Sequence, residues 1–271
     1  MKLRSIKRLS WHILTVALLL IVAPALPVLS GASPGQQGIE KSLQDAYKGR
    51  TLSLRRFYLG PKLEFDSNGV LVGDRVVGSW TLYCRVFVDD IKLESHVLEI
   101  RGHRLSLRYF PQQSGFQASQ DGEVQIRVDL HHELSSAQDL EPLFAKIFVT
   151  PGENFSALVP PYWREFCSHM SDPGWSEKQV KKARAQASSI RHIFDPRLSK
   201  APRKENATAT AALSIVIDDY GHVSDAVIIR PVGMGLDEKA VETVRTWRFE
   251  PARRPIPMRI LVEIGFHLIG F

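Results

Sequence analysis

Apolar and polar side chains alternate along three stretches in the middle of the chain, residues 80–88, 105–109 and 124–130. Successive side chains of a β-strand point to opposite faces, so each stretch predicts a strand with one apolar and one polar face. Strands of this kind form antiparallel sheets that pack one face on a core and expose the other face to water. The pattern predicts an α+β protein whose residues 39–150 form an antiparallel, β-rich domain.

Two local signals add detail to this domain. Asn68 and Gly69, which both tolerate positive φ, lie between two short apolar runs and predict a hairpin turn. Ser136 and Asp139 have the spacing of a pair that caps the start of a helix. The expected helix carries one apolar stripe, formed by Leu140, Leu143, Phe144 and Ile147. We expect this helix to pack against the periphery of the sheet.

Residues 1–32 have the arrangement of a secretory signal peptide. Four basic residues precede an apolar run over residues 13–23, and the small residues Ser30 and Ala32 suit the positions before a cleavage site. An apolar helix of this length rises about 16 Å, well short of the roughly 30 Å hydrocarbon core of a bilayer. We expect a cleaved leader and an exported chain. The alternative is an uncleaved anchor with the rest of the chain on the far side of the membrane.

Charge and cysteine content exclude two classes of protein. The formal net charge is +6, but outside residues 1–32 there are 31 basic and 29 acidic side chains, which gives no support for a nucleic-acid partner. Two cysteines, Cys84 and Cys167, are too few for a disulfide scaffold or a four-cysteine zinc site. In an oxidising compartment they can form one disulfide, and the alternative is two buried thiols.

Residues 151–206 differ in character from the domain before them. Pro151, Pro160 and Pro161 interrupt regular structure, and residues 177–188 then have the composition of a polar helix. Nine lysine or arginine residues lie between Lys178 and Lys204. We interpret this segment as a solvated basic connector with one helix.

The C-terminal unit, residues 207–271, has the pattern of two strands, a helix and a last strand. Alternating apolar residues predict strands over residues 213–217 and 223–229, and the helix runs from Leu236 to Trp247 before a strand over residues 258–267. Asp237 and Glu238 in the first turn suit the helix dipole. The helix has an apolar stripe of Leu236, Ala240, Val241, Val244 and Trp247, and an outer face of Glu238, Lys239, Glu242 and Arg245.

Motifs that would indicate an enzyme are missing from the sequence. It has no P-loop, no dinucleotide-binding glycine motif, no zinc-protease helix and no nucleophile elbow. His131 and His132 would face opposite sides of a strand, and Cys167 with His169 has no further ligand at recognisable spacing. We expect no catalytic residue, no metal site, no cofactor and no enzymatic activity. An enzyme housed in the β-rich domain is the alternative, and it would need a metal or a strongly perturbed titratable group in a pocket of residues 40–150.

Residues 233–241, GMGLDEKAV, are followed by residues 244–252, VRTWRFEPA, so that a W-R-F-E-P element comes directly after the expected helix. Residues 216–225 form the turn of the preceding hairpin. Together these segments closely resemble the TonB C-terminal domain family, the energy-transducer type. Residues 52–58 and 78–82 also resemble the β-rich domain that precedes such modules in some acidobacterial proteins.

This resemblance implies a periplasmic protein that binds outer-membrane TonB-dependent receptors in energy-dependent transmembrane transport. In the family, a receptor segment adds as a strand beside the last strand of the module, which is β-augmentation. The matching residues here are Met258, Arg259, Ile260, Leu261, Val262, Glu263, Ile264, Gly265 and Phe266. The residues that match the structural motif of the family are Gly221, Gly235, Leu236, Ala240, Val244, Trp247, Phe249 and Pro251.

The resemblance leaves two questions of partnership open. ExbB–ExbD-like proteins become partners if the N-terminal segment is a retained anchor, and the resemblance is also compatible with a homodimer. The main alternative is a soluble periplasmic interaction protein that uses the same module on a different partner.

Overall fold

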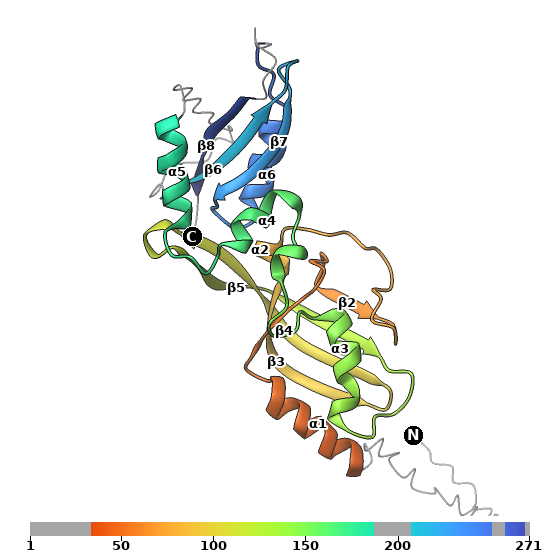
Figure 1. Cartoon of the computed structure of the whole chain (residues 1–271). Helices are drawn as coiled ribbons and strands as arrows, with labels where there is room; N and C mark the ends of the chain where they lie inside the picture. Colours follow the sequence, from red (N-terminus) through yellow and green to blue (C-terminus); the bar gives the residue numbers. More distant parts are fainter. Residues whose placement is uncertain (1–33, 187–206, 251–257, 269–271) are drawn as a thin grey trace, which may run out of the picture. The chain divides into compact units, whose positions relative to one another are not determined.

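The computed structural model describes residues 34–186, 207–250 and 258–268 (Figure 1). By its internal contacts, the chain from Ala32 to Phe271 forms one compact unit. Helices and two separate sheets are present, which confirms the predicted α+β class. The expected leader, residues 1–32, lies outside the described residues.

The first sheet has five strands in the order β1-β3-β4-β5-β2. The strands are β1 (Thr51–Ser53), β2 (Lys62–Phe65), β3 (Arg85–Glu94), β4 (Val97–Phe110) and β5 (Gly115–Asp129). Neighbouring strands are antiparallel except for β2, which runs parallel to β5. The predicted antiparallel, β-rich region is therefore confirmed, with one parallel edge strand that the periodicity did not reveal.

The turn at Asn68 and Gly69 forms, and the two segments that flank it pair antiparallel over a short length, as the predicted hairpin requires. The amide of Asp66 donates to the carbonyl of Val70 at 2.9 Å, and Gly69 has a φ of +76°. Beyond the turn, Leu71 forms an antiparallel bridge with Phe65, and the amide of Val72 donates to the carbonyl of Glu64 at 2.7 Å, while β2 also pairs with β5. The local turn was predictable from the sequence, whereas the parallel pairing of β2 with β5 was not.

Residues 80–83 are helical, although alternation predicted a strand there. They form α2 (Trp80–Tyr83), and the hydroxyl of Ser79 caps it by accepting from the amide of Thr81 at 3.2 Å. Trp80 and Cys84 are both buried. Their spacing of four residues fits one face of a helix as well as one face of a strand, so alternation alone did not distinguish the two.

Two helices pack against one face of the first sheet. They are α1 (Pro34–Tyr47) and α3 (Glu141–Ile147), and the 3-10 turn η2 (Ala137–Leu140) precedes α3. The predicted cap is present, because the amide of Ser136 donates to the carboxylate of Asp139 at 2.9 Å. The core between helices and sheet contains Leu43, Leu98, Ile126, Leu140, Phe144 and Ile147. The opposite face keeps Lys92, Arg101 and Arg127 exposed, as expected for a half-solvated sheet.

The second sheet has three antiparallel strands in the order β7-β6-β8. The strands are β6 (Ala207–Ile217), β7 (Val223–Arg230) and β8 (Met258–Leu268), and α6 (Leu236–Arg245) lies between β7 and β8 in sequence. The predicted strand–strand–helix–strand order is therefore confirmed. Ala240, Val241 and Val244 of α6 are fully buried, in agreement with the predicted stripe.

The segment predicted as a connector contains two helices before residue 187. They are α4 (Pro161–Ser168) and α5 (Trp175–Gln186), and the short 3-10 turns η1 (Pro111–Gln113) and η3 (Phe155–Ala157) lie earlier in the chain. Pro161 occupies the first turn of α4, where its missing N–H leaves no helical hydrogen bond unmade. It therefore starts a helix instead of interrupting structure.

The end of β4 shares a hydrophobic core with the second sheet, and this core is separate from the one between the first sheet and helices α1 and α3. Trp80 and Leu107 from the first half of the chain, Trp163 from α4, and Leu213 and Val241 from the C-terminal unit belong to the same buried cluster. Main-chain bonds cross the same boundary. The amide of Tyr109 donates to the carbonyl of Val232 at 2.8 Å, and the amide of Met234 donates to the carbonyl of Leu107 at 2.9 Å. The segment after β7 is thus hydrogen-bonded to β4.

Candidate functional site

Strand β8 lies at the end of the second sheet (Figure 1). It pairs with β6 over eleven residues, from Met258 opposite Ile217 to Leu268 opposite Ala207, with no shift of register. The strand predicted over residues 258–267 is present and stands at a sheet edge. Alternate residues of an edge strand direct their N–H and C=O groups away from the sheet, and these groups are free to pair with another strand.

One face of β8 is anchored in the core. Ile260, Val262, Ile264 and Phe266 are 8%, 4%, 1% and 5% exposed, and they belong to the same hydrophobic cluster as Val241 of α6. The alternate residues Leu261, Glu263 and Gly265 are only partly buried. Since the apolar side chains fix the strand by packing, its outer backbone edge is held in an extended conformation.

The other face of the sheet carries a chain of ion pairs with α5. A carboxylate oxygen of Glu263 lies 2.6 Å from Arg184 of α5 and 2.9 Å from Arg230 of β7. Arg230 is also 3.3 Å from Glu177 of α5. The side chain of Arg230 is 12% exposed, and a guanidinium this well buried requires carboxylate partners. These contacts hold α5 against both outer strands of the sheet.

Two strands that have a free edge in the described part of the chain, β5 and β7, are paired less regularly than β8. Beyond its pairing with β2, residues 115–124 of β5 have no second strand partner, but the register with β4 shifts between His103 and Leu105. Asp121, Gly122 and Glu123 stand at this irregularity. Bulges and charges are devices that oppose edge-to-edge pairing. The pairing of β6 with β7 also has two register shifts, so β8 offers the most regular edge.

Gly221, in the turn between β6 and β7, lies against Phe249, which follows the end of α6. Its φ is +80°, and a Cβ at this position would lie 2.0 Å from the carbonyl oxygen of Phe249. The amide of Phe249 donates to the carbonyl of Gly221 at 2.9 Å. Trp247 and Phe249 are partly buried and pack against the shared core, as predicted. Pro251 lies outside the described residues.

The start of α6 is more buried than the assignment of Asp237 and Glu238 to the helix dipole, and of Glu238 to the outer face, indicated. Asp237 is fully buried, and it accepts from the amides of Val232 at 2.8 Å and Gly233 at 2.7 Å. Burial raises the pKa of Asp237 to about 8, against the opposing effect of these two amides. Glu238 accepts from the indole N–H of Trp163 at 2.8 Å, and burial also raises its pKa. Sequence reasoning missed this contact because Trp163 is remote in the chain.

Gly235, another motif residue, also contacts the first half of the chain. It has a φ of +70°, and its amide donates to the hydroxyl of Thr81 at 3.0 Å. The next motif residue, Leu236, is partly buried against the shared core. The helix start that the motif forms is therefore bound by α2 and α4, a role that the motif by itself does not indicate.

The two cysteines are free thiols in this structure, so the disulfide that the sequence allowed is not formed in it. Cys84 is buried and Cys167 is partly buried. Burial raises the pKa of Cys84 to about 11 and that of Cys167 to about 12. His169 stacks on Trp175 with ring centroids 4.7 Å apart, so its ring is engaged with α5 and not paired with Cys167 as a catalytic base.

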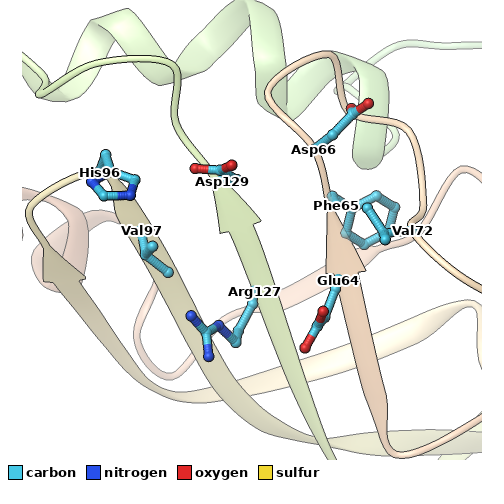
Figure 2. Close-up of a pocket in the computed structure, with 8 residues that line it drawn as sticks. All are labelled: Glu64, Phe65, Asp66, Val72, His96, Val97, Arg127 and Asp129. Carbon is cyan, nitrogen blue, oxygen red and sulfur yellow. The ribbon is translucent and has the colours of Figure 1, made fainter.

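A polar hollow opens beside β2 and β5 in the first sheet. Figure 2 shows its acidic side chains arising from different places, Glu64 on β2, Asp66 after β2 and Asp129 at the end of β5. Its volume is about 390 Å³, and His96 and Arg127 also line it. Among the described residues, no group of three or more histidine, cysteine, aspartate or glutamate side chains is arranged to hold a metal ion. The acidic side chains of the hollow are therefore not grouped as a metal-ligand set.

The helices of the described residues are too short or too polar to span a membrane. None of them has the length and apolar character needed to cross a bilayer.

Comparison with known protein families identifies the C-terminal part of the chain. Residues 178–268 match the family described as the Gram-negative bacterial TonB protein C-terminal. The match begins inside α5 and ends at the last residue of β8, so it includes the helix that carries Arg184. No curated protein and no solved structure matches the chain.

Proposed function

Residues 178–268 form a TonB C-terminal domain, and from this premise we propose that the chain binds an outer-membrane TonB-dependent receptor by strand addition to β8. The domain is a non-enzymatic interaction domain of receptor-linked transport, and proteins of this family act in the periplasm. The proposal assigns the receptor contact to Met258–Leu268 and assigns no catalytic activity to the chain.

The observation that carries the proposal is the uninterrupted edge of β8. Its eleven residues pair with β6 in one register, and they contain neither proline nor lysine, two residues that commonly protect an edge. An extended receptor segment would satisfy the outward N–H and C=O groups of alternate residues. Main-chain bonding of this kind tolerates variation in the receptor sequence.

The two faces of β8 have different parts in this binding. The buried face fixes the strand, through Val262 and its apolar neighbours, so little ordering cost remains when a partner strand adds. On the other face, Glu263 is already held by Arg184 and Arg230. We therefore expect side chains to adjust the affinity and the backbone to supply most of it.

Location in the periplasm is part of the proposal. It rests on the family of residues 178–268 and on the arrangement of residues 1–32 as a leader. Mass spectrometry of the mature N-terminus should find a chain that starts near Ser33. An intact peptide of residues 1–8 in membrane fractions would replace the cleaved form with an anchored one, for which ExbB–ExbD-like partners become the expectation.

A peptide series tests strand addition without altering the protein. Residues 32–271, which form one compact unit, are titrated with a TonB-box peptide of a receptor and with variants N-methylated at one position each. Because only alternate amides of an added strand face β8, methylation at one parity should abolish binding and at the other parity should leave it nearly unchanged. Loss of affinity without this alternation, or no binding of the parent peptide, would reject strand addition.

Proline substitutions in the protein provide the matched pair. Neighbouring residues of β8 direct their amides to opposite sides, so only one of Val262 and Glu263 presents its N–H to a partner. We expect one of the variants Val262→Pro and Glu263→Pro to lose pairing with β6 and the other to stay folded but fail to bind. If Val262→Pro and Glu263→Pro both fold and both bind the peptide as tightly as wild type, the proposal is wrong.

A further inference from the structure

The first residues of β6 have a strand partner on one side only. Strand β8 pairs with all of β6, down to Ala207, whereas β7 reaches only Ala212, which faces Arg230. Within the described residues, Ala207–Ala211 therefore have no strand on the β7 side. This is a second free edge in the TonB-like domain, separate from the outer edge of β8.

Strand β7 stops pairing with β6 at Arg230 for a physical reason. Pro231 follows Arg230 and has no N–H to continue the ladder. The next residues turn to β4, where Val232 accepts from the amide of Tyr109 at 2.8 Å. The path from β7 to β4 thus leaves a gap between the free edge of β6 and the end of β4.

This gap is a cavity of about 650 Å³, which we call the β6 slot. Thr208, Ala209 and Thr210 line it from the β6 edge, and Arg108 and Phe110 line it from β4. Its volume is within the range of sites that bind small ligands or short peptides. Five edge residues at about 3.3 Å each would accommodate an extended segment of about 16 Å.

The charge of the slot selects the class of ligand. The guanidinium of Arg108 lies 5.1 Å from the ring centre of Phe110 and has no acidic partner among the described residues. The other charged groups at the slot, Arg230 and Glu177, neutralise each other at 3.3 Å. One uncompensated positive charge beside a free strand edge favours an extended peptide with an acidic side chain.

We propose that the β6 slot binds an extended, acidic peptide segment of a partner protein, which pairs with Ala207–Ala211 and places a carboxylate on Arg108. This binding is independent of strand addition at β8. The chain's own residues 187–206 are disfavoured as the occupant by charge, because they contain five basic and two acidic residues. The partner strand would extend the second sheet on the side that β7 leaves open.

The test uses a labelled, amidated pentapeptide of alternating threonine and valine with glutamate at the centre, and the same peptide with glutamine. Fluorescence anisotropy with residues 32–271 should show saturable binding of the glutamate peptide and about 10-fold weaker binding of the glutamine peptide, because a charge-assisted hydrogen bond is lost. In Arg108→Gln the two peptides should bind equally. Arg127→Gln, an exposed arginine on β5, is the control and should preserve the difference.

Hydrogen exchange decides where the peptide binds. The slot predicts slower exchange in the complex only for those amides of residues 207–211 that face away from β8, and unchanged exchange at β8. A bulky residue in Thr208→Trp should abolish binding, and circular dichroism verifies that this variant is folded. Absence of saturable binding, an unchanged preference in Arg108→Gln, or protection at β8 instead would overturn the proposal. A dimer that Thr208→Trp converts to a monomer would also overturn it, because the occupant would then be a second copy of this chain.

Discussion

Replacing Gly233 by alanine should weaken the attachment of the TonB-like domain to the first sheet. Gly233 has a φ of +87°, and a Cβ there would lie 2.1 Å from the carbonyl oxygen of Leu107 on β4. No side-chain rotation relieves this contact, because both partners are backbone. The substitution must therefore move the segment after β7 away from β4.

The expected loss follows from two contributions. A non-glycine residue in the left-handed region costs about 1–2 kcal/mol. Displacement of the segment also breaks the bonds from Tyr109 to Val232, at 2.8 Å, and from Met234 to Leu107, at 2.9 Å. At about 0.5–1.5 kcal/mol for each hydrogen bond, the total decrease in the free energy of unfolding is about 2–5 kcal/mol.

Urea unfolding of residues 32–271 measures this loss. Tryptophan fluorescence is a suitable probe, because Trp80 and Trp163 both lie in the shared core. The control is Gly152→Ala, since Gly152 has a similar φ of +83° but a Cβ added there would meet no atom within 4 Å. The control should lose only the conformational cost of about 1–2 kcal/mol.

The difference between the two variants is the decisive quantity. If Gly233→Ala and Gly152→Ala lose the same stability, the close approach to Leu107 does not hold the two sheets together. Wild type should unfold in one transition, because residues 32–271 form one compact unit whose two buried clusters are joined at β4. Separate transitions for the two sheets in wild type would also refute the shared core.

Three further predictions concern buried groups. Burial raises the pKa of Asp237 from its ordinary value near 4 to about 8, so the folded state retains a proton that the unfolded state loses. The free energy of unfolding should therefore fall as pH rises between about 4 and about 8. Asp237→Asn should flatten this fall in urea titrations at several pH values, and an unchanged slope would contradict the assignment. Burial raises the pKa values of Cys84 and Cys167 to about 11 and about 12. Both thiols should therefore react slowly with a thiol reagent in the native chain at pH 8 and rapidly in urea. Fewer than two reactive thiols after denaturation without reductant would instead indicate a disulfide. Trp247→Ala should lower the free energy of unfolding by about 2 kcal/mol, less than for a fully buried tryptophan because the ring is partly exposed, and no loss would show that Trp247 does not pack against the core.

Helix α6 shows which features the residue pattern can predict and which it cannot. The stripe of Ala240, Val241 and Val244 was predicted, because helical periodicity is a property of nearby residues. Asp237 and Glu238 were assigned to the helix dipole, and Glu238 was also placed on the outer face of the helix. Glu238 accepts from the indole of Trp163 on α4, 75 residues earlier in the chain, and no local spacing encodes that contact.

The first sheet shows the same division. Alternation predicted strands and a half-solvated face, and the capping pair of Ser136 and Asp139 predicted the start of a helix. The alternation did not predict that β2 runs parallel to β5, nor that residues 80–83 are helical. Strand partners depend on which edges are free after the whole chain has folded, and a four-residue spacing is shared by one face of a strand and of a helix.

Local chemistry was therefore enough to predict the strand–strand–helix–strand order, and the resemblance of its motif to the TonB C-terminal domain family implied β8 as the candidate binding strand. Gly221 belongs to that local code, since a turn with positive φ requires it. The tertiary structure alone decided that β8 keeps an uninterrupted outer edge, that Pro231 leaves a slot beside β6, and that the end of β4 packs into the core of the second sheet. These features arise from pairing and packing between residues distant in sequence, and such contacts are chosen by the free energy of the whole fold.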